Sequence, residues 1–169
     1  RLFAGAPQSW SAAQKDAREG KLHGFALPVT VRLHVVSKQR EISSPNVVGV
    51  LRGSDASLAG EYLVYSAHTD HLGIGRALNG DAIYNGAVDD ASGTSALIEM
   101  AKAFASLPKR PARSILFLAA TAEEKGLLGS DYFAHYPTVP AGSLVADINM
   151  DGASVFYTFK DLVPLGAEH

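Results

Sequence analysis

The chain has 169 residues, enough for one compact domain with a sizeable core, and its 47% hydrophobic and 19% charged residues are usual for globular proteins. Its net charge of −2 argues against nucleic acid or an anionic membrane as a partner, and no apolar run approaches the roughly 20 residues that span a bilayer. The absence of cysteine excludes disulfides and thiolate ligands, so any metal must be held by histidine and carboxylate side chains.

The first third of the chain predicts one helix and two strands. A helix is expected over residues 9–19, because Gly20 is a typical helix-stop residue. Alternating apolar and polar residues predict a half-buried strand over residues 29–35, and a short apolar run predicts another over residues 47–51. Residues 1 to about 27 are therefore a candidate appendage that precedes the sheet.

From residue 62 onward, strand-like and helix-like patterns alternate. Strands are expected over residues 62–67, 115–120 and 144–148, and helices over residues 96–107 and 127–136. The run at residues 115–120 is continuously apolar, which is typical of a strand covered by helices on both faces. The sequence thus predicts an α/β fold built on a parallel sheet.

A histidine and several acidic residues follow these apolar runs or lie in the loops between them. Because the carboxyl ends of parallel strands share one edge of a sheet, side chains that are distant in sequence can meet there. We therefore expect a site at this edge. Its candidate residues are His68, Asp70, Asp89, Asp90, Glu123, Glu124 and Asp151.

His68 and Asp70 are two residues apart at a strand end, so both side chains can leave the same face. An acid in this position can accept the second ring N–H of a metal-binding histidine. The alternative is a surface histidine that happens to lie beside an acid. His71 is interpreted as a bystander or as a group supporting the ligands.

Each acidic motif also has an ordinary explanation. One acid before the helix at residue 96 would serve as its N-cap, so we assign capping or backbone support to Asp90 and metal binding to Asp89. Glu123 and Glu124 repel one another, and either solvent or a cation relieves that repulsion. With a cation, one glutamate binds the metal and the other holds a water as general base. Asp151 alone would simply head a turn.

Charge favours two cations over one. Three carboxylates, from Asp89, Glu124 and Asp151, together with one hydroxide would neutralise two divalent cations. A histidine among oxygen ligands favours Zn, Co or Mn over Ca or Mg, and we expect zinc.

Together these motifs resemble the M28 family of di-zinc aminopeptidases. The resemblance covers about residues 46–152, and its motifs are His68-Thr69-Asp70, Asp89-Asp90-Ala91-Ser92-Gly93, Glu123 to Ser130 and Asn149-Met150-Asp151. It implies a phosphorylase/hydrolase-like three-layer sandwich with a mostly parallel central sheet flanked by helices. It also implies a zinc-dependent exopeptidase that hydrolyses the N-terminal residue of peptides with a water activated by two zinc ions.

The resemblance further implies a role for each residue. His68 and Asp151 would be terminal zinc ligands, Asp89 the bridging carboxylate, Glu124 a ligand of the other zinc, Glu123 the general base, and Asp70 the acid behind the histidine.

The resemblance divides the chain into two parts. Residues 1–45 resemble the end of a protease-associated insert with a connecting strand, and residues 46–169 resemble part of the catalytic domain. The family's fifth ligand, a downstream histidine, has no match, because His135 comes too early and His169 ends the chain. We therefore expect a fragment that binds zinc weakly or at one site and has little activity. The resemblance also implies a secreted or periplasmic location.

Two other functions remain open at this point. A related zinc enzyme with carboxypeptidase or glutaminyl cyclase activity would carry the same motifs, since end-group recognition depends on other residues. A metal-free binding module is the alternative from another class. The retained acids argue against it for the parent protein.

Overall fold

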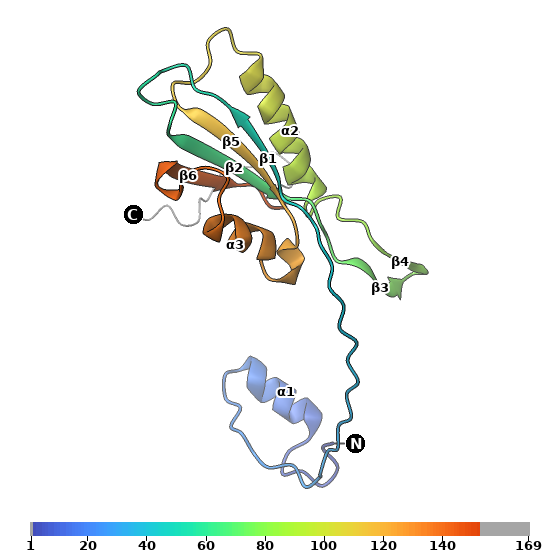
Figure 1. Cartoon of the computed structure of the whole chain (residues 1–169). Helices are drawn as coiled ribbons and strands as arrows, with labels where there is room; N and C mark the ends of the chain where they lie inside the picture. The colour runs from blue at the N-terminus through green and yellow to red at the C-terminus, as the bar shows by residue number, and fades with distance from the viewer. Residues whose placement is uncertain (1, 153–169) are drawn as a thin grey trace. The chain divides into compact units, whose positions relative to one another are not determined.

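The computed structural model describes residues 2–152, while residue 1 and residues 153–169, including His169, lie outside the described part of the chain. It contains two compact units, Arg1–Glu41 and Ile42–His169, which are described separately. Figure 1 labels the elements, which are α1 (Trp10–Arg18), β1 (Val47–Leu51), β2 (Tyr62–His68), β3 (Gly73–Leu78), β4 (Asp81–Tyr84), α2 (Ala91–Ala105), β5 (Ser114–Ala120), the 3₁₀ helix η1 (Glu123–Lys125), α3 (Leu128–His135), the 3₁₀ helix η2 (Ala141–Ser143) and β6 (Leu144–Asn149).

The first unit contains helix α1. Ser9 caps the helix, because its hydroxyl accepts a hydrogen bond from the backbone N–H of Ala12. The ring of Phe3 contacts Trp10 and Phe25 edge-on, with centroids 5.2 and 6.1 Å apart. The helix predicted over residues 9–19 is confirmed.

The strand predicted over residues 29–35 is wrong, because these residues have no regular secondary structure. Leu33 and Val35 are 82% and 79% exposed, so the alternating apolar residues have no core to face. A strand also needs a neighbour for its backbone groups, and among residues 2–152 no strand pairs with this segment. The interpretation of residues 1–45 as the end of an insert stays a prediction.

The second unit is built on a four-stranded sheet in the order β1-β5-β2-β6. Strand β2 runs parallel to both β5 and β6, and β1 at the edge runs antiparallel to β5. The register pairs His68 with Ala120 and Ser66 with Asn149. As a result, β2, β5 and β6 end at the same edge of a mostly parallel sheet, as predicted.

Helices α2 and α3 cover opposite faces of this sheet (Figure 1). Alternate residues of β5 point to opposite faces: Leu116 packs with Phe133 of α3, whereas Ile115 and Phe117 pack with Leu97 of α2. Burial of each such side chain contributes about 1.5–3 kcal/mol. The predicted three-layer α/β architecture is confirmed, with β5 as its most buried strand.

The hairpin of β3 and β4 is a feature that the sequence interpretation missed. Asn79 and Gly80 form its tight turn, and both have positive φ angles, 51° and 90°. An Asn-Gly pair between two short strands is a strong hairpin signal that was available in the sequence. It was missed because every residue of β3 is exposed, so the strand lacks the alternation of buried apolar and exposed polar residues that identifies a strand.

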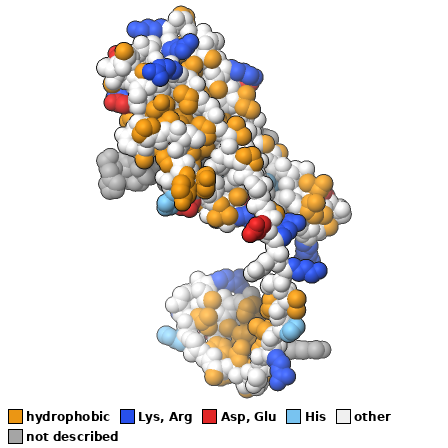
Figure 2. All heavy atoms as spheres, viewed as in Figure 1, with side chains coloured by type: hydrophobic (Ala, Val, Ile, Leu, Met, Phe, Trp, Pro, Cys, Tyr) orange, Lys and Arg blue, Asp and Glu red, His pale blue; other side chains and the backbone are white. Residues whose placement is uncertain are grey.

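Hydrophobic side chains gather on part of the surface of the second unit, as Figure 2 shows. The large exposed apolar residues of α3 and β6 are Leu128, Tyr132, Val145 and Ile148. None of the helices within residues 2–152 is long and apolar enough to cross a membrane.

Candidate metal centre

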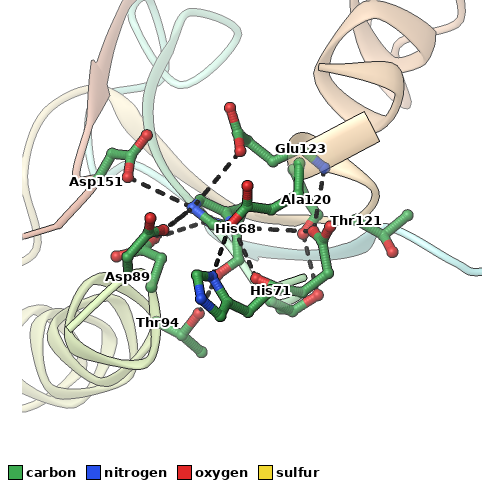
Figure 3. A network of polar contacts seen from close by, with 12 residues as sticks. His68, His71, Asp89, Thr94, Ala120, Thr121, Glu123 and Asp151 are labelled. Carbon is green, nitrogen blue, oxygen red and sulfur yellow. Dashed lines mark hydrogen bonds and ion pairs between the residues drawn. The ribbon is translucent and has the colours of Figure 1, made fainter. Parts of the chain in front are cut away.

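Polar side chains converge where the three parallel strands end (Figure 3). His68 is the last residue of β2, and Glu123 begins η1 directly after β5. Asp151 follows β6, while Asp89 lies in the loop that leads into α2. The site is therefore assembled from four separate segments of the chain.

His68 is buried within this site, where it is only 3% exposed. Its backbone N–H donates to a carboxylate oxygen of Asp90, and its carbonyl accepts a hydrogen bond from the Thr94 hydroxyl. Its ring Nδ1 lies 2.9 Å from the carbonyl oxygen of Asp70. Because a carbonyl only accepts hydrogen bonds, the neutral ring carries its proton on Nδ1 and a lone pair on Nε2.

The Nε2 atom of His68 points toward a ring of carboxylates. It lies 3.0 Å from an oxygen of Asp89, 3.4 Å from Asp151 and 3.9 Å from Glu123. Nevertheless Nε2 is shielded from solvent and has no hydrogen-bond partner in the described part of the chain. A lone pair in this position among acids is suited to a cation.

Asp90 anchors the site through the backbone. Its side chain is fully buried, and it caps α2 by accepting a hydrogen bond from the N–H of Gly93. It also accepts hydrogen bonds from the N–H groups of His68 and Gly152. These contacts tie β2, α2 and the end of β6 together, and the predicted capping role of Asp90 is confirmed.

Asp70 differs from the sequence interpretation in one respect. Its carboxylate lies 3.8 Å from Nδ1 of His68, beyond hydrogen-bond distance, and its backbone carbonyl takes that place instead. The chain turns directly after β2 and brings the carbonyl back toward the ring. The carboxylate accepts a hydrogen bond from the N–H of Glu123 and so fixes the start of η1.

The potential ligand atoms form two groups. His68, Asp90 and Asp151 make one group, and His71, Asp89 and Glu124 make the other. In the first group, the backbone hydrogen bonds of Asp90 leave His68 and Asp151 as the groups available to a cation. In the second group, Nδ1 of His71 and Oε1 of Glu124 are buried and lack hydrogen-bond partners among the described residues. Nitrogen and carboxylate donors of this kind fit zinc.

The electrostatics of the metal-free site show how closely its acids are placed. Burial opposes a charge on His68, but the nearby acids, first of all Asp90, outweigh it and raise the pKa of the ring above 6.5. The pKa of the Glu123 carboxyl is raised, chiefly by burial and further by Asp151, although His68 opposes this shift. Both shifts keep protons where a cation would otherwise neutralise the charge.

The structure thus brings together all the residues predicted for the site. It does not bring His135 there, because this side chain is 68% exposed on α3 and contacts Asp131. The sequence interpretation left His71 as a bystander or a supporting group, and the structure places it in the cluster beside Asp89 and Glu124. A histidine three positions after His68 could have suggested it, but only the path of the loop shows where it points.

Comparison with known proteins agrees with this geometry. The sequence profile of peptidase family M28 matches residues 46–158. A probable zinc metalloprotease of Pyricularia oryzae is 37% identical over 77% of this chain, and the aminopeptidase NAALADL1 of Rattus norvegicus is 33% identical over 76%. A probable glutamate carboxypeptidase AMP1 of Arabidopsis thaliana is 32% identical over 89%. The chain spans 26%, 17% and 20% of the length of these relatives.

Solved structures show the same fold. A peptidase M28 precursor from Shewanella amazonensis superposes with a TM-score of 0.53 at 28% identity, over 63% of this chain and 22% of its own. The zinc aminopeptidase BSAP from Bacillus subtilis gives 0.50 at 29% identity, over 63% and 24%. LapB from Legionella pneumophila gives 0.50 at 35% identity, over 64% and 27%.

Proposed function

The chain belongs to peptidase family M28, and we propose that it forms part of the catalytic domain of a zinc-dependent aminopeptidase. The proposed reaction is hydrolysis of the peptide bond that follows the N-terminal residue. The observation that carries the proposal is the free Nε2 of His68, which faces carboxylates from separate loops and has no hydrogen-bond partner among residues 2–152. The solved relative BSAP is described as a zinc aminopeptidase, which supports the same activity.

Two zinc ions are proposed for this site. His68 and Asp151 would hold one ion, Glu124 the other, and Asp89 would lie between them. Its carboxylate is 3.0 Å from Nε2 of His68 and also belongs to the group around Glu124. When bound, such ions polarise a carbonyl group and lower the pKa of a water molecule toward neutrality.

Glu123 is proposed as the general base. Its carboxylate would accept the proton of the attacking water and pass it to the leaving amine. The residue is well placed for this, because Ala122 turns the chain in a left-handed conformation and Asp70 holds the N–H of Glu123.

Replacement of the base tests this assignment. In the zinc-loaded protein that contains this chain, Glu123→Gln should retain zinc and lower turnover of an aminoacyl substrate by a factor of about 10² to 10⁴. The matched control is Glu99→Gln, since Glu99 is 70% exposed on α2 and pairs with Lys102 at the surface. Loss of zinc with turnover retained would reverse the roles of Glu123 and Glu124.

A carboxypeptidase is the second candidate. The 32% identity to a probable glutamate carboxypeptidase over 89% of this chain favours it. A panel of substrates separates the two, because an aminopeptidase requires a free amino terminus and a carboxypeptidase a free carboxyl terminus. An N-terminal glutamine substrate in the same panel tests cyclase activity. Release of the C-terminal residue alone would replace the aminopeptidase proposal.

A further inference from the structure

The side chain of Asn46 holds both ends of the turn that carries Glu123 and Glu124. Its Oδ1 accepts a hydrogen bond from the backbone N–H of Thr121 at 3.0 Å, and its Nδ2 donates one to the backbone carbonyl of Gly129 at 2.8 Å. Thr121 follows β5 directly, and Gly129 is the second residue of α3. Asn46 itself precedes β1 and is 75 and 83 residues away from these partners in the sequence. One amide group therefore connects the edge strand, the end of β5 and the start of α3.

The turn between these two contacts has an unusual backbone. Ala122 and Leu127 have positive φ angles of 54° and 61°, a conformation that residues with a Cβ adopt only when surrounding contacts hold them. The carbonyl of Glu123 accepts a hydrogen bond from the N–H of Leu127 at 2.8 Å, which shapes the turn from within. Asp70 at the N–H of Glu123, and Asn46 at both ends, attach the turn to the rest of the unit. The position of the turn therefore depends on these outside contacts.

The surroundings of the Asn46 amide are closely packed. Thr121 is only 8% exposed, and its hydroxyl oxygen lies 2.6 Å from that of Ser44. A Cβ added to Gly129 would lie 2.6 Å from Oδ1 of Asn46 and would overlap the backbone of Thr121, so only glycine permits this approach of α3. Loss of the amide would leave a buried N–H and a buried carbonyl without their partner. The contact is thus a specific one that a surface side chain could not replace.

We propose that Asn46 is a positioning residue for the general base, because it fixes the turn from which the Glu123 carboxylate faces the metal centre. That carboxylate lies 3.9 Å from Nε2 of His68 (Figure 3). Asn46 acts on it through the backbone of Thr121 and Gly129. The proposal rests on the proposed function, in which Glu123 is the base. The alternative is that Asn46 stabilises the fold without any effect on the base.

Two substitutions test the two halves of the amide. Asn46→Ala removes both the donor and the acceptor. Asn46→Asp keeps the shape of the side chain, but an ionised carboxylate only accepts hydrogen bonds, so it cannot donate to the carbonyl of Gly129. Both variants should loosen the turn. The Asn46→Asp variant decides the question if Asn46→Ala fails to fold.

Hydrogen exchange of single amides in the metal-free chain measures the turn directly. The N–H of Glu123 is the probe, because the carboxylate of Asp70 holds it, and the N–H of Val64 in the central strand β2 reports opening of the whole sheet. In the Asn46 variants, exchange at Glu123 should accelerate about tenfold more than exchange at Val64. Acceleration confined to Thr121, with Glu123 following Val64, would overturn the proposal.

The matched control is Ser114→Ala at the opposite end of β5. The hydroxyl of Ser114 also joins two backbone groups, since it donates to the carbonyl of Ala59 at 2.7 Å and accepts from the N–H of Gly53 at 2.9 Å. Its loss should lower the stability of the sheet without accelerating exchange at Glu123 beyond that at Val64. The same selective acceleration of Glu123 in this control would mean that any weakening of β5 loosens the turn, and would overturn a specific role of Asn46.

Kinetics separate this inference from the function on which it rests. In the protein that contains this chain, at saturating zinc, Asn46→Ala and Asn46→Asp should lower kcat for an aminoacyl substrate about tenfold or more and leave KM unchanged. Ser114→Ala should retain kcat at a temperature where it is folded. An unchanged kcat in the Asn46 variants would overturn the positioning role, while Glu123→Gln would still test the base. If the unaltered protein does not release N-terminal residues, the proposed function is wrong and the assignment of Asn46 to a base fails with it, whatever the exchange rates show.

Discussion

A neutral imidazole has one N–H and one lone pair, and the backbone carbonyl of Asp70 decides which nitrogen of His68 carries which. The carbonyl accepts the hydrogen bond from Nδ1–H, so the lone pair on Nε2 points at the acids. Main-chain groups thus orient the histidine, and the carboxylate of Asp70 is free to hold the N–H of Glu123. One turn of the chain after β2 therefore positions both a candidate ligand and the candidate base.

Asp90 is the residue whose loss should harm the fold most directly. Its buried carboxylate accepts hydrogen bonds from three backbone N–H groups. Asp90→Ala removes an N-cap and leaves the other donors buried without partners, so the free energy of unfolding should fall by about 2–4 kcal/mol. Urea unfolding checks this, with Asp131→Ala as the control, because that side chain is 68% exposed. A loss no larger than the control's would show that the buried hydrogen bonds contribute little.

The raised pKa of His68 predicts how the metal-free chain responds to pH. The folded state holds the proton more tightly than the unfolded state, whose ordinary value is 6.5. This contribution to stability is therefore complete below pH 6.5 and is lost as the pH rises through the higher folded-state pKa. Urea unfolding in the presence of a chelator should show stability falling with pH across this window.

The His68→Gln variant provides the comparison for that experiment. Glutamine does not titrate, so the part of the pH dependence that belongs to His68 should disappear. The same slope in both proteins would mean that another group causes it. Bound zinc should reverse the trend in the unaltered chain, because protons compete with the metal for Nε2.

At the scale of helices and strands, elements with a buried face were predictable from the sequence. The apolar run of β5 and the helical spacing of α2 reflect contacts that the fold makes. The alternating apolar residues at 29–35 form an equally clear pattern, yet in the described part of the chain this segment does not pair with any sheet. The exposed β3–β4 hairpin is the reverse: it forms in the structure, but its sequence has no apolar pattern. Only the residues of its turn indicate it.

The site followed from the same reasoning. His68 ends β2, and Glu123 and Asp151 follow β5 and β6 closely, so strand polarity alone predicts that they meet. The position of His71 depends on a loop that must pass close to Gly86, and no periodic pattern reports such a contact. The contact between the Asp70 carbonyl and the His68 ring could not be predicted from the sequence for the same reason. It depends on a turn of the backbone and not on a residue type.

The start of helix α2 offers a prediction at this scale. Gly→Ala in a helix normally stabilises a protein by about 0.5–1 kcal/mol. At Gly93, however, an added Cβ would lie 2.4 Å from the Asp90 carboxylate and 2.4 Å from the Met150 carbonyl. Gly93→Ala should therefore destabilise the chain by about 1–3 kcal/mol.

The matched comparison is Gly49→Ala in strand β1, where an added Cβ meets nothing within 4 Å. This change should leave stability equal or slightly higher, since alanine restricts the unfolded chain. Thermal unfolding of both variants measures the difference. Equal effects at the two positions would mean that the end of β6 does not pack as closely on α2 as the structure indicates.

For the molecule as a whole, the proposed metal centre would link segments that are distant in sequence. The proposed ligands come from the end of β2, the loop before α2, η1 and the loop after β6. A cation bound there stabilises the folded state by an amount that grows with its concentration relative to its dissociation constant. A bound cation would thus cross-link the carboxyl ends of the parallel strands. The first unit, Arg1–Glu41, provides none of these ligands.

This asymmetry leads to a prediction with an internal control. At a zinc concentration about 100 times the dissociation constant, binding contributes about 2.7 kcal/mol, so removal of zinc by a chelator should lower the melting temperature of the second unit by roughly 10 °C. Hydrogen exchange resolves the units within one sample. Backbone amides at the ends of β2, β5 and β6 should exchange faster without zinc, while those of α1 in the first unit keep their rate. Equal acceleration in both units would show a general effect of the chelator, and unchanged rates in both would show that the cation does not link these strands.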